Sequence, residues 1–231
     1  MKLIPFFSTF ALAMTLSLPV VVQAEGKPVG ITADLMSVTI AGTEIKRDQD
    51  NAATVAADFA KTSRPCPPFC IQPGTIAPGV ETIAELEILD YLKKQDGGDK
   101  GIMVIDSRTP DWVEKGSIPG AKNIPWTGLE PKEGATTEGI IKIMTEEFGV
   151  KLKEGKDALD VDEAVAAGKV ADVFDYASAK TLVMFCNGMW CGQSPTNIKK
   201  LLGMGYPPEK LKWYRGGMQD WAILGLATTK K

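Results

Sequence analysis

Thr181-Leu-Val-Met-Phe185 is followed by Cys186-Asn-Gly-Met-Trp-Cys-Gly-Gln193 and then by Ser194-Pro195, and these residues are the most informative about the architecture. The first five residues predict a strand buried on both faces of a parallel sheet. The next eight form a loop, and Ser194-Pro195 predicts a helix start, because serine suits the N-cap and proline the first helical position. Backbone N–H groups of the loop and the positive end of the helix dipole then converge on the Cys186 sulfur. Both favour the thiolate, which is the nucleophilic form of cysteine.

The rest of the chain alternates between strand-like and helix-like patterns. Ile102-Met-Val-Ile105 is a second short apolar run, and Thr82-Ile-Ala-Glu85 has the spacing of a helix capping box. We expect strand-like segments at 31–47, 102–105, 121–124 and 211–214, in addition to the strand before Cys186. We expect helices at 51–61, 82–95, 137–148 and 160–167, a helical turn at 111–115, a helix after the cysteine loop and a last helix after Gly216-Gly217. In chain order, the strands and helices largely alternate. This order predicts an α/β domain whose central, mainly parallel sheet is flanked by helices.

The first 24 residues have the features of a secretory signal peptide. Lys2 precedes an almost wholly apolar stretch, and Val22-Gln23-Ala24 resembles a cleavage site, so we expect cutting after Ala24. An uncleaved membrane anchor is the alternative. Cleavage predicts a periplasmic or secreted protein without membrane association, since no second apolar run of spanning length follows.

The mature chain divides into an N-terminal extension at 25–80 and a main domain at 81–228. Within the domain, residues 127–180 form an elaborated insertion that is rich in charge and interrupted by glycines. We interpret it as a solvated covering layer or a partner-binding surface.

Composition excludes several function classes. The 26 basic and 29 acidic residues nearly balance without a basic patch, so we expect no nucleic-acid partner. The chain has no histidine, which excludes Ser-His-Asp and Cys-His catalysis, histidine-ligated zinc and c-type haem attachment. We expect no cofactor and no metal, because the spacings within the two cysteine pairs are loose for a four-thiolate zinc site.

The four cysteines form two local pairs, Cys66/Cys70 and Cys186/Cys191. The first pair lies in a proline-rich loop at 63–74, where the prolines exclude a regular helix or a central strand. A structural disulfide between Cys66 and Cys70 is the first interpretation for an exported protein. Exchange with the second pair, or two free thiols, are the alternatives.

Three separated segments carry a resemblance to a known family. They are Ile105-Asp-Ser-Arg108 with Gly116-Ser-Ile-Pro-Gly-Ala121, the strand that ends in Cys186, and Gly216-Gly-Met-Gln-Asp-Trp221 with Gly225. Together they resemble the rhodanese-like (sulfurtransferase) family over about residues 80–228. The resemblance implies a rhodanese-like α/β domain in which Cys186 takes a sulfane sulfur as a persulfide. It also implies transfer of that sulfur to a thiol or another nucleophilic acceptor.

The loop departs from the usual family pattern in length and charge. Eight residues precede Ser194 where the family usually has six, and none is lysine or arginine, which counts against the dianion thiosulfate as donor. We expect the loop to bind a persulfide or anion through Asn187, Gly188, Met189, Trp190, Gly192 and Gln193. Supporting roles fall to Asp106, Arg108 and Arg215, with the two arginines supplying charge from outside the loop. A structural ion pair is the alternative for Asp106 and Arg108.

The second loop cysteine leaves three interpretations open. Cys191 is a resolving thiol for Cys186, a second sulfur-handling thiol, or a small buried residue. Trp190 either packs the loop or offers an aromatic wall to an organic or polysulfide donor. A phosphatase of the same architecture needs arginine six positions after the cysteine, and that position is Gly192.

The sequence therefore predicts sulfane-sulfur transfer through Cys186. The expected partners are a small sulfur-containing donor and a thiol acceptor, or a sulfur-relay protein. A non-catalytic sulfur carrier that binds a partner, and a dithiol–disulfide oxidoreductase using Cys186 and Cys191, are the alternatives.

Overall fold

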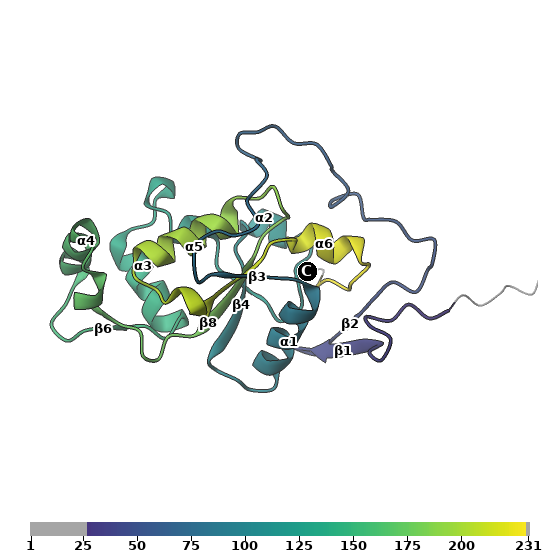
Figure 1. The fold of residues 1–231 in the computed structure, drawn as a ribbon, viewed down its shortest axis with the longest axis horizontal. Helices are drawn as coiled ribbons and strands as arrows, with labels where there is room; N and C mark the ends of the chain where they lie inside the picture. The colour runs from purple at the N-terminus through teal and green to yellow at the C-terminus, as the bar shows by residue number, and fades with distance from the viewer. Residues whose placement is uncertain (1–26, 230–231) are drawn as a thin grey trace, which may run out of the picture.

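A five-stranded parallel sheet forms the centre of the structure, a computed structural model that describes residues 27–229 (Figure 1). Its strands are, in spatial order, β3 (Glu81–Ile83), β9 (Leu211–Tyr214), β8 (Thr181–Phe185), β4 (Ile102–Asp106) and β5 (Lys122–Asn123). Asp106, Phe185 and Tyr214 lie in register at the carboxyl edge of the sheet. The predicted α/β class with a parallel sheet is confirmed. The predicted signal peptide lies outside the described residues.

Helices cover both faces of the sheet. The α-helices of the described part are α1 (Glu85–Asp96), α2 (Pro110–Val113), α3 (Thr137–Lys142), α4 (Ala158–Ala167), α5 (Gln193–Gly203) and α6 (Gly217–Ile223). Shorter 3-10 turns are η1 (Trp126–Gly128), η2 (Pro131–Glu133), η4 (Val170–Asp172) and η5 (Pro208–Lys210). Helices α1 and α6 pack on one face, whereas α5 and the insertion pack on the other (Figure 1).

The alternation of side chains along β8 explains why its sequence is apolar throughout. Leu182 and Met184 belong to the buried cluster beneath α5, and Val183 and Phe185 belong to the cluster beneath α1 and α6. All four are fully buried. Because a central strand has no solvent-facing position, every residue of this run faces a core. The residue that follows, Cys186, is thereby held at the carboxyl edge.

The insertion at 127–180 contributes side chains to the hydrophobic core. It is therefore not only the solvated covering layer that was one interpretation of its sequence. Ile140, Phe148, Val161 and Phe174 are buried in the same cluster as Leu182. Its first predicted helix is split into α3 and a π-helical turn, η3 (Ile143–Glu147), and its second is α4. Its strands β6 (Lys151–Leu152) and β7 (Phe174–Asp175) form a small antiparallel pair.

The extension begins with an antiparallel hairpin of β1 (Ser37–Ile40) and β2 (Thr43–Lys46), in the segment predicted to be β-type. It then runs round the outside of α6 and α2 before entering β3 (Figure 1). The helix predicted at 51–61 is wrong, because this segment forms isolated turns. The carboxylates of Asp48 and Asp50 accept hydrogen bonds from backbone N–H groups two residues later, which favours turns over helix.

Two helix starts also differ from the sequence prediction. Thr82 does not cap α1, since it lies in β3 and its hydroxyl donates to the Gly74 carbonyl at 2.6 Å. Helix α1 begins two residues later than a cap at Thr82 requires, and the Glu87 carboxylate accepts from the Ala84 N–H at 3.0 Å. Helix α5 begins at Gln193 with Gly192 as its N-cap, so Ser194 lies inside the first turn and is not the cap.

Cys66 and Cys70 are joined by a disulfide that closes the proline-rich loop, which is the first of the interpretations given above. Cys186 and Cys191 are free, buried thiols. Among residues 27–229, no helix has both the length and the apolar character needed to cross a membrane. The same residues contain no cluster of three or more cysteine, aspartate or glutamate side chains placed to hold a metal ion.

Candidate active site at the cysteine loop

Cys186 lies directly after β8, between the carboxyl end of the sheet and the first turn of α5. Its side chain is buried, with 2% of its surface exposed. The Ser194 hydroxyl donates to the Cys186 Sγ at 3.1 Å. That hydroxyl oxygen accepts from Trp213 Nε1, also at 3.1 Å, which directs the serine proton towards the sulfur. Ser194 therefore acts on the thiol and does not cap the helix.

Hydrogen bonds determine the ionisation of this thiol. Burial raises the pKa of Cys186, but hydrogen bonds from the Cys191 thiol, the Ser194 hydroxyl and the backbone N–H groups of Ser194 and Gly188 together lower it. Burial raises the pKa of Cys191 well above its ordinary value, and the hydrogen bond and negative charge of Cys186 add to that rise. The pair is thus asymmetric, because the surroundings favour the thiolate form at Cys186 and the protonated form at Cys191.

This asymmetry predicts the pH dependence of alkylation. The thiolate is the reactive form, so the alkylation rate of Cys186 by iodoacetamide should fall as pH drops through the lowered pKa. We expect the midpoint of this rate profile to lie below the ordinary thiol pKa, and Ser194→Ala to move it upward because one donor is lost. Peptide mass mapping identifies which cysteine reacts. An unmoved midpoint in Ser194→Ala would contradict the role given to the hydroxyl.

Helix α6 fixes the outer side of the loop. The N–H groups of Met218 and Gln219 donate to the carbonyls of Cys186 and Asn187, at 2.9 and 3.0 Å. This approach requires glycine at position 217, whose φ is +57° and whose Cβ would lie 2.3 Å from the Cys186 carbonyl oxygen. The Cys186 and Asn187 carbonyls therefore point towards α6 and accept hydrogen bonds from it. The N–H groups of the loop remain available on the side that faces the Cys186 sulfur.

The predicted loop residues have different surroundings. The Gly188 N–H donates to the Cys186 sulfur. Gln193 is the first residue of α5, and its side-chain oxygen accepts a hydrogen bond from the Cys191 Sγ at 3.7 Å. Met189 is exposed at 39%, and its carbonyl accepts from the Gln72 N–H at 2.8 Å. The loop is thus tied to the extension on its exposed side.

Asp106 and Arg108 form a fully buried ion pair with an Nη2 to Oδ2 distance of 2.6 Å. The guanidinium also donates to the Gly116 carbonyl at 2.7 Å and to the Asn187 side-chain oxygen at 3.4 Å, and the Ser117 hydroxyl donates to Asp106 at 2.7 Å. This arrangement is the structural ion pair given above as the alternative. Arg108 braces the cysteine loop through Asn187.

Arg215 is likewise engaged with protein acceptors. Its guanidinium donates to the backbone carbonyls of Gln72 and Pro73 at 2.8 and 3.2 Å. It therefore holds the extension against the domain near the loop. These contacts differ from the anion-binding role expected of it.

Beside the loop lies a cavity of about 290 Å³ with aromatic walls. Trp190 contributes one wall and is fixed by a hydrogen bond from its Nε1 to Gln219 Oε1 at 2.8 Å. Phe69 of the extension meets Trp190 edge to face, with ring centroids 5.5 Å apart. Trp112 and Trp126 complete the aromatic lining, and Cys191 reaches the same cavity. Sequence patterns did not indicate Phe69, Trp112 or Trp126, because no local periodicity marks a contact between an irregular extension and a distant loop.

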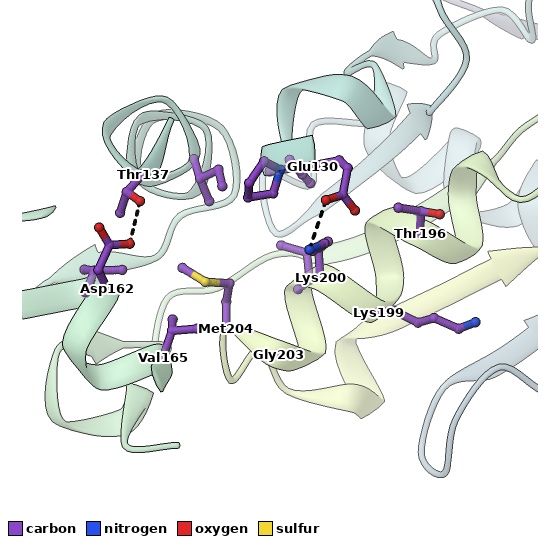
Figure 2. Close-up of a pocket in the computed structure, with 14 residues that line it drawn as sticks. Glu130, Thr137, Asp162, Val165, Thr196, Lys199, Lys200, Gly203 and Met204 are labelled. Atoms are coloured by element: carbon purple, nitrogen blue, oxygen red, sulfur yellow. Dashed lines mark hydrogen bonds and ion pairs between the residues drawn. The ribbon is translucent and has the colours of Figure 1, made fainter. Parts of the chain in front are cut away.

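A second cavity of about 490 Å³ lies between α5 and the insertion (Figure 2). Its lining includes a Glu130–Lys200 ion pair at 3.2 Å and a Thr137–Asp162 hydrogen bond at 2.6 Å. Burial acts to raise the pKa of Glu130, but hydrogen bonds from Lys132 and Lys200 lower it. Neither loop cysteine lines this cavity, and only Thr196 is common to both cavities.

Comparison with known proteins identifies the family. A family model for the rhodanese-like domain matches residues 89–224. No curated protein matches this chain.

Several solved structures are similar to the chain, and the following three superpose on it only weakly. A protein of unknown function from Rhodopseudomonas palustris, described as a possible tyrosine phosphatase, has 19% identity and a TM-score of 0.40, covering 65% of this chain and 85% of that one. Thiosulfate sulfurtransferase from Pseudomonas aeruginosa has 16% identity and a TM-score of 0.35, covering 65% and 20%. The human single-domain sulfurtransferase TSTD1 has 18% identity and a TM-score of 0.32, covering 62% and 95%. The family match spans more than half of the sequence, and the chain therefore belongs to the rhodanese-like domain family.

Proposed function

We propose that this protein transfers sulfane sulfur through a persulfide on Cys186. The observation that carries the proposal is a buried thiol whose pKa is lowered by hydrogen bonds from Ser194 and Gly188. A persulfide is an anion that needs stabilisation by N–H and O–H donors but needs no metal or general base. A chain without histidine has the groups for this chemistry.

The transfer proceeds in two displacement steps. The Cys186 thiolate attacks the terminal sulfur of a donor, a Cys186 S–S bond forms, and the donor's S–S bond breaks so that its remainder leaves with the electron pair. An acceptor thiolate then attacks the outer sulfur of the persulfide, and the Cys186 thiolate is released. No electrons are gained or lost overall, so no redox cofactor takes part.

The proposal includes the compartment in which the protein acts. Cleavage after Ala24 would place the protein in the periplasm or outside the cell, where the Cys66–Cys70 disulfide is stable. The partners are a small sulfur donor and a thiol acceptor, or a protein of a sulfur relay.

Intact-mass measurement tests the proposal. Wild-type protein treated with polysulfide and freed of excess reagent should gain the mass of one sulfur atom. Addition of a thiol acceptor should remove that mass and yield the acceptor's persulfide. A protein that gains no sulfur from polysulfide, or that cannot release it to any thiol, would overturn the proposal.

A second candidate function rests on the closeness of the two loop thiols: the Cys186 Sγ donates to the Cys191 carbonyl at 3.4 Å, and each thiol shifts the pKa of the other. In it, the Cys191 thiolate attacks the Cys186 sulfur of the persulfide, a Cys186–Cys191 disulfide forms, and hydrosulfide leaves with the electron pair. The sulfane sulfur is thereby reduced to sulfide and the dithiol is oxidised, so an external thiol reductant must restore the pair. Release of sulfide in proportion to disulfide formation distinguishes this reaction from transfer.

A further inference from the structure

We infer that the cavity between α5 and the insertion is a binding site for a small organic amine, whose ammonium group contacts Glu130 and whose apolar body fills the cavity. The site is separate from the cysteine loop, because neither Cys186 nor Cys191 lines this cavity. The inference therefore goes beyond sulfur transfer and does not depend on it. The supporting observations are the apolar lining, an open carboxylate oxygen and the distribution of charge around the cavity.

The cavity has the size and the lining of a small-ligand site. Its volume of about 490 Å³ lies within the range of such sites, roughly 300–1,000 Å³. Most of its surface comes from apolar side chains of the hydrophobic core, namely Leu129, Ile140, Val161 and Leu201. Met204 adds a flexible thioether, which adapts to the shape of an apolar ligand (Figure 2). An apolar group of a ligand is therefore removed from water when it enters this cavity.

Glu130 has one carboxylate oxygen that is open to a ligand. The residue is 8% exposed, so its carboxylate is largely shielded from water. Its Oε1 accepts from both the Lys132 N–H and the Lys200 ammonium, each at 3.2 Å. Its Oε2 has no hydrogen-bond partner within residues 27–229 and is not fully enclosed by protein. An ammonium group donates a charge-assisted hydrogen bond to such an oxygen.

The charges around the cavity favour a cation over an anion. Across the cavity from Glu130, Asp162 of α4 accepts from the Thr137 hydroxyl through Oδ1, and its Oδ2 has no partner among the described residues (Figure 2). Two lysines belong to the lining. Lys200 is already paired with Glu130, and Lys199 extends away from both carboxylates (Figure 2). An anionic ligand would therefore meet two carboxylates and one cation that is already paired.

A primary amine with a short apolar body meets these requirements. An aliphatic amine is positively charged at neutral pH, as the lysine side chain is. Its ammonium group donates to Glu130 Oε2 and shares that carboxylate with Lys200, while its apolar body lies against the core side chains. A neutral head group gains only the apolar contact, and a carboxylate head group is repelled by Glu130.

The test compares hexylammonium with hexanol and hexanoate, which share an apolar body and differ in the charge of the head group. Calorimetric titration should give a Kd for hexylammonium about tenfold below that for hexanol, with hexanoate binding most weakly. Glu130→Gln keeps the size of the side chain but removes its charge. It should raise the Kd for hexylammonium about tenfold and leave that for hexanol nearly unchanged. Glu133→Gln is the matched control, because it removes an exposed carboxylate from the same turn, η2, outside the cavity.

Lys200→Gln gives a result that a disturbed cavity cannot imitate. It releases Glu130 from its ion pair, so it should lower the Kd for hexylammonium, whereas damage to the cavity would raise the Kd in both variants. Methionine-methyl NMR locates the ligand, since the Met204 resonance should shift and that of Met189, in the cysteine loop, should not.

Three results would each overturn the inference. The first is equal affinity for hexylammonium and hexanol, and the second is the same Kd for hexylammonium in Glu130→Gln and Glu133→Gln. The third is a shift of the Met189 resonance in place of Met204, which would put the amine at the cysteine loop.

Discussion

Cys186→Ser is expected to abolish sulfur loading and to lower turnover by about a thousandfold or more. Removal of a covalent nucleophile eliminates the step on which all later steps depend. Serine retains the size of the side chain, so the buried site between β8 and α5 should keep its fold. Intact mass after polysulfide treatment measures the loading, and cyanide-dependent turnover measures the rate.

Cys191→Ser is the matched control within the same loop. Burial and the neighbouring Cys186 favour the protonated form of Cys191, so its serine variant should still gain one sulfur atom on Cys186. The loss of its hydrogen bond to Cys186 should raise the pKa of Cys186 and slow loading near neutral pH. Equal sulfur addition to Cys186→Ser and wild type would rule out Cys186 as the nucleophile.

Asp106→Ala is expected to lower the free energy of unfolding by about 3–5 kcal/mol. The substitution leaves the Arg108 guanidinium buried without its counter-charge, and an uncompensated buried charge is strongly destabilising. The Ser117 hydroxyl loses its acceptor at the same time. Urea denaturation, followed by circular dichroism, measures the change from the shift in midpoint.

Two comparisons isolate the effect of the buried charge. Glu44→Ala removes a carboxylate from an exposed ion pair with Lys46 and should leave the unfolding midpoint nearly unchanged. Replacing the buried pair together, by Asp106→Leu with Arg108→Met, should recover much of the lost stability because no buried charge remains. A loss in Asp106→Ala no larger than in Glu44→Ala would show that burial is not the cause.

The strand, loop and helix around Cys186 could be predicted because their determinants are local. A continuous apolar run fits a central parallel strand, and a helix after the loop follows from its amphipathic pattern at Ile198 and Leu201. The role of Ser194 could not be predicted in the same way. Its hydroxyl orientation is determined by Trp213, which lies on a different strand.

The extension shows where sequence reasoning was insufficient. Its alanine-rich segment at 51–61 has helical composition, but Asp48 and Asp50 stabilise turns, and a segment of this length gains little from isolated helix formation. Its contacts with Trp190 and Met189 join residues more than a hundred positions apart. Such contacts depend on tertiary packing, so Phe69 and Gln72 gave no signal in the sequence.

The Cys66–Cys70 disulfide closes the loop that carries Pro68 and Phe69, and these two residues line the aromatic cavity together with the free thiol Cys191. Phe69 lies between the two bridged cysteines and touches Trp190, whose neighbour is the free thiol Cys191. Closing the first pair requires oxidising surroundings, whereas keeping Cys186 nucleophilic requires that it stay reduced. The Cys66–Cys70 disulfide and a reduced Cys186 therefore exist together only over a limited range of reduction potential. The redox state of the surroundings thus determines whether the cavity and the nucleophile are present at the same time.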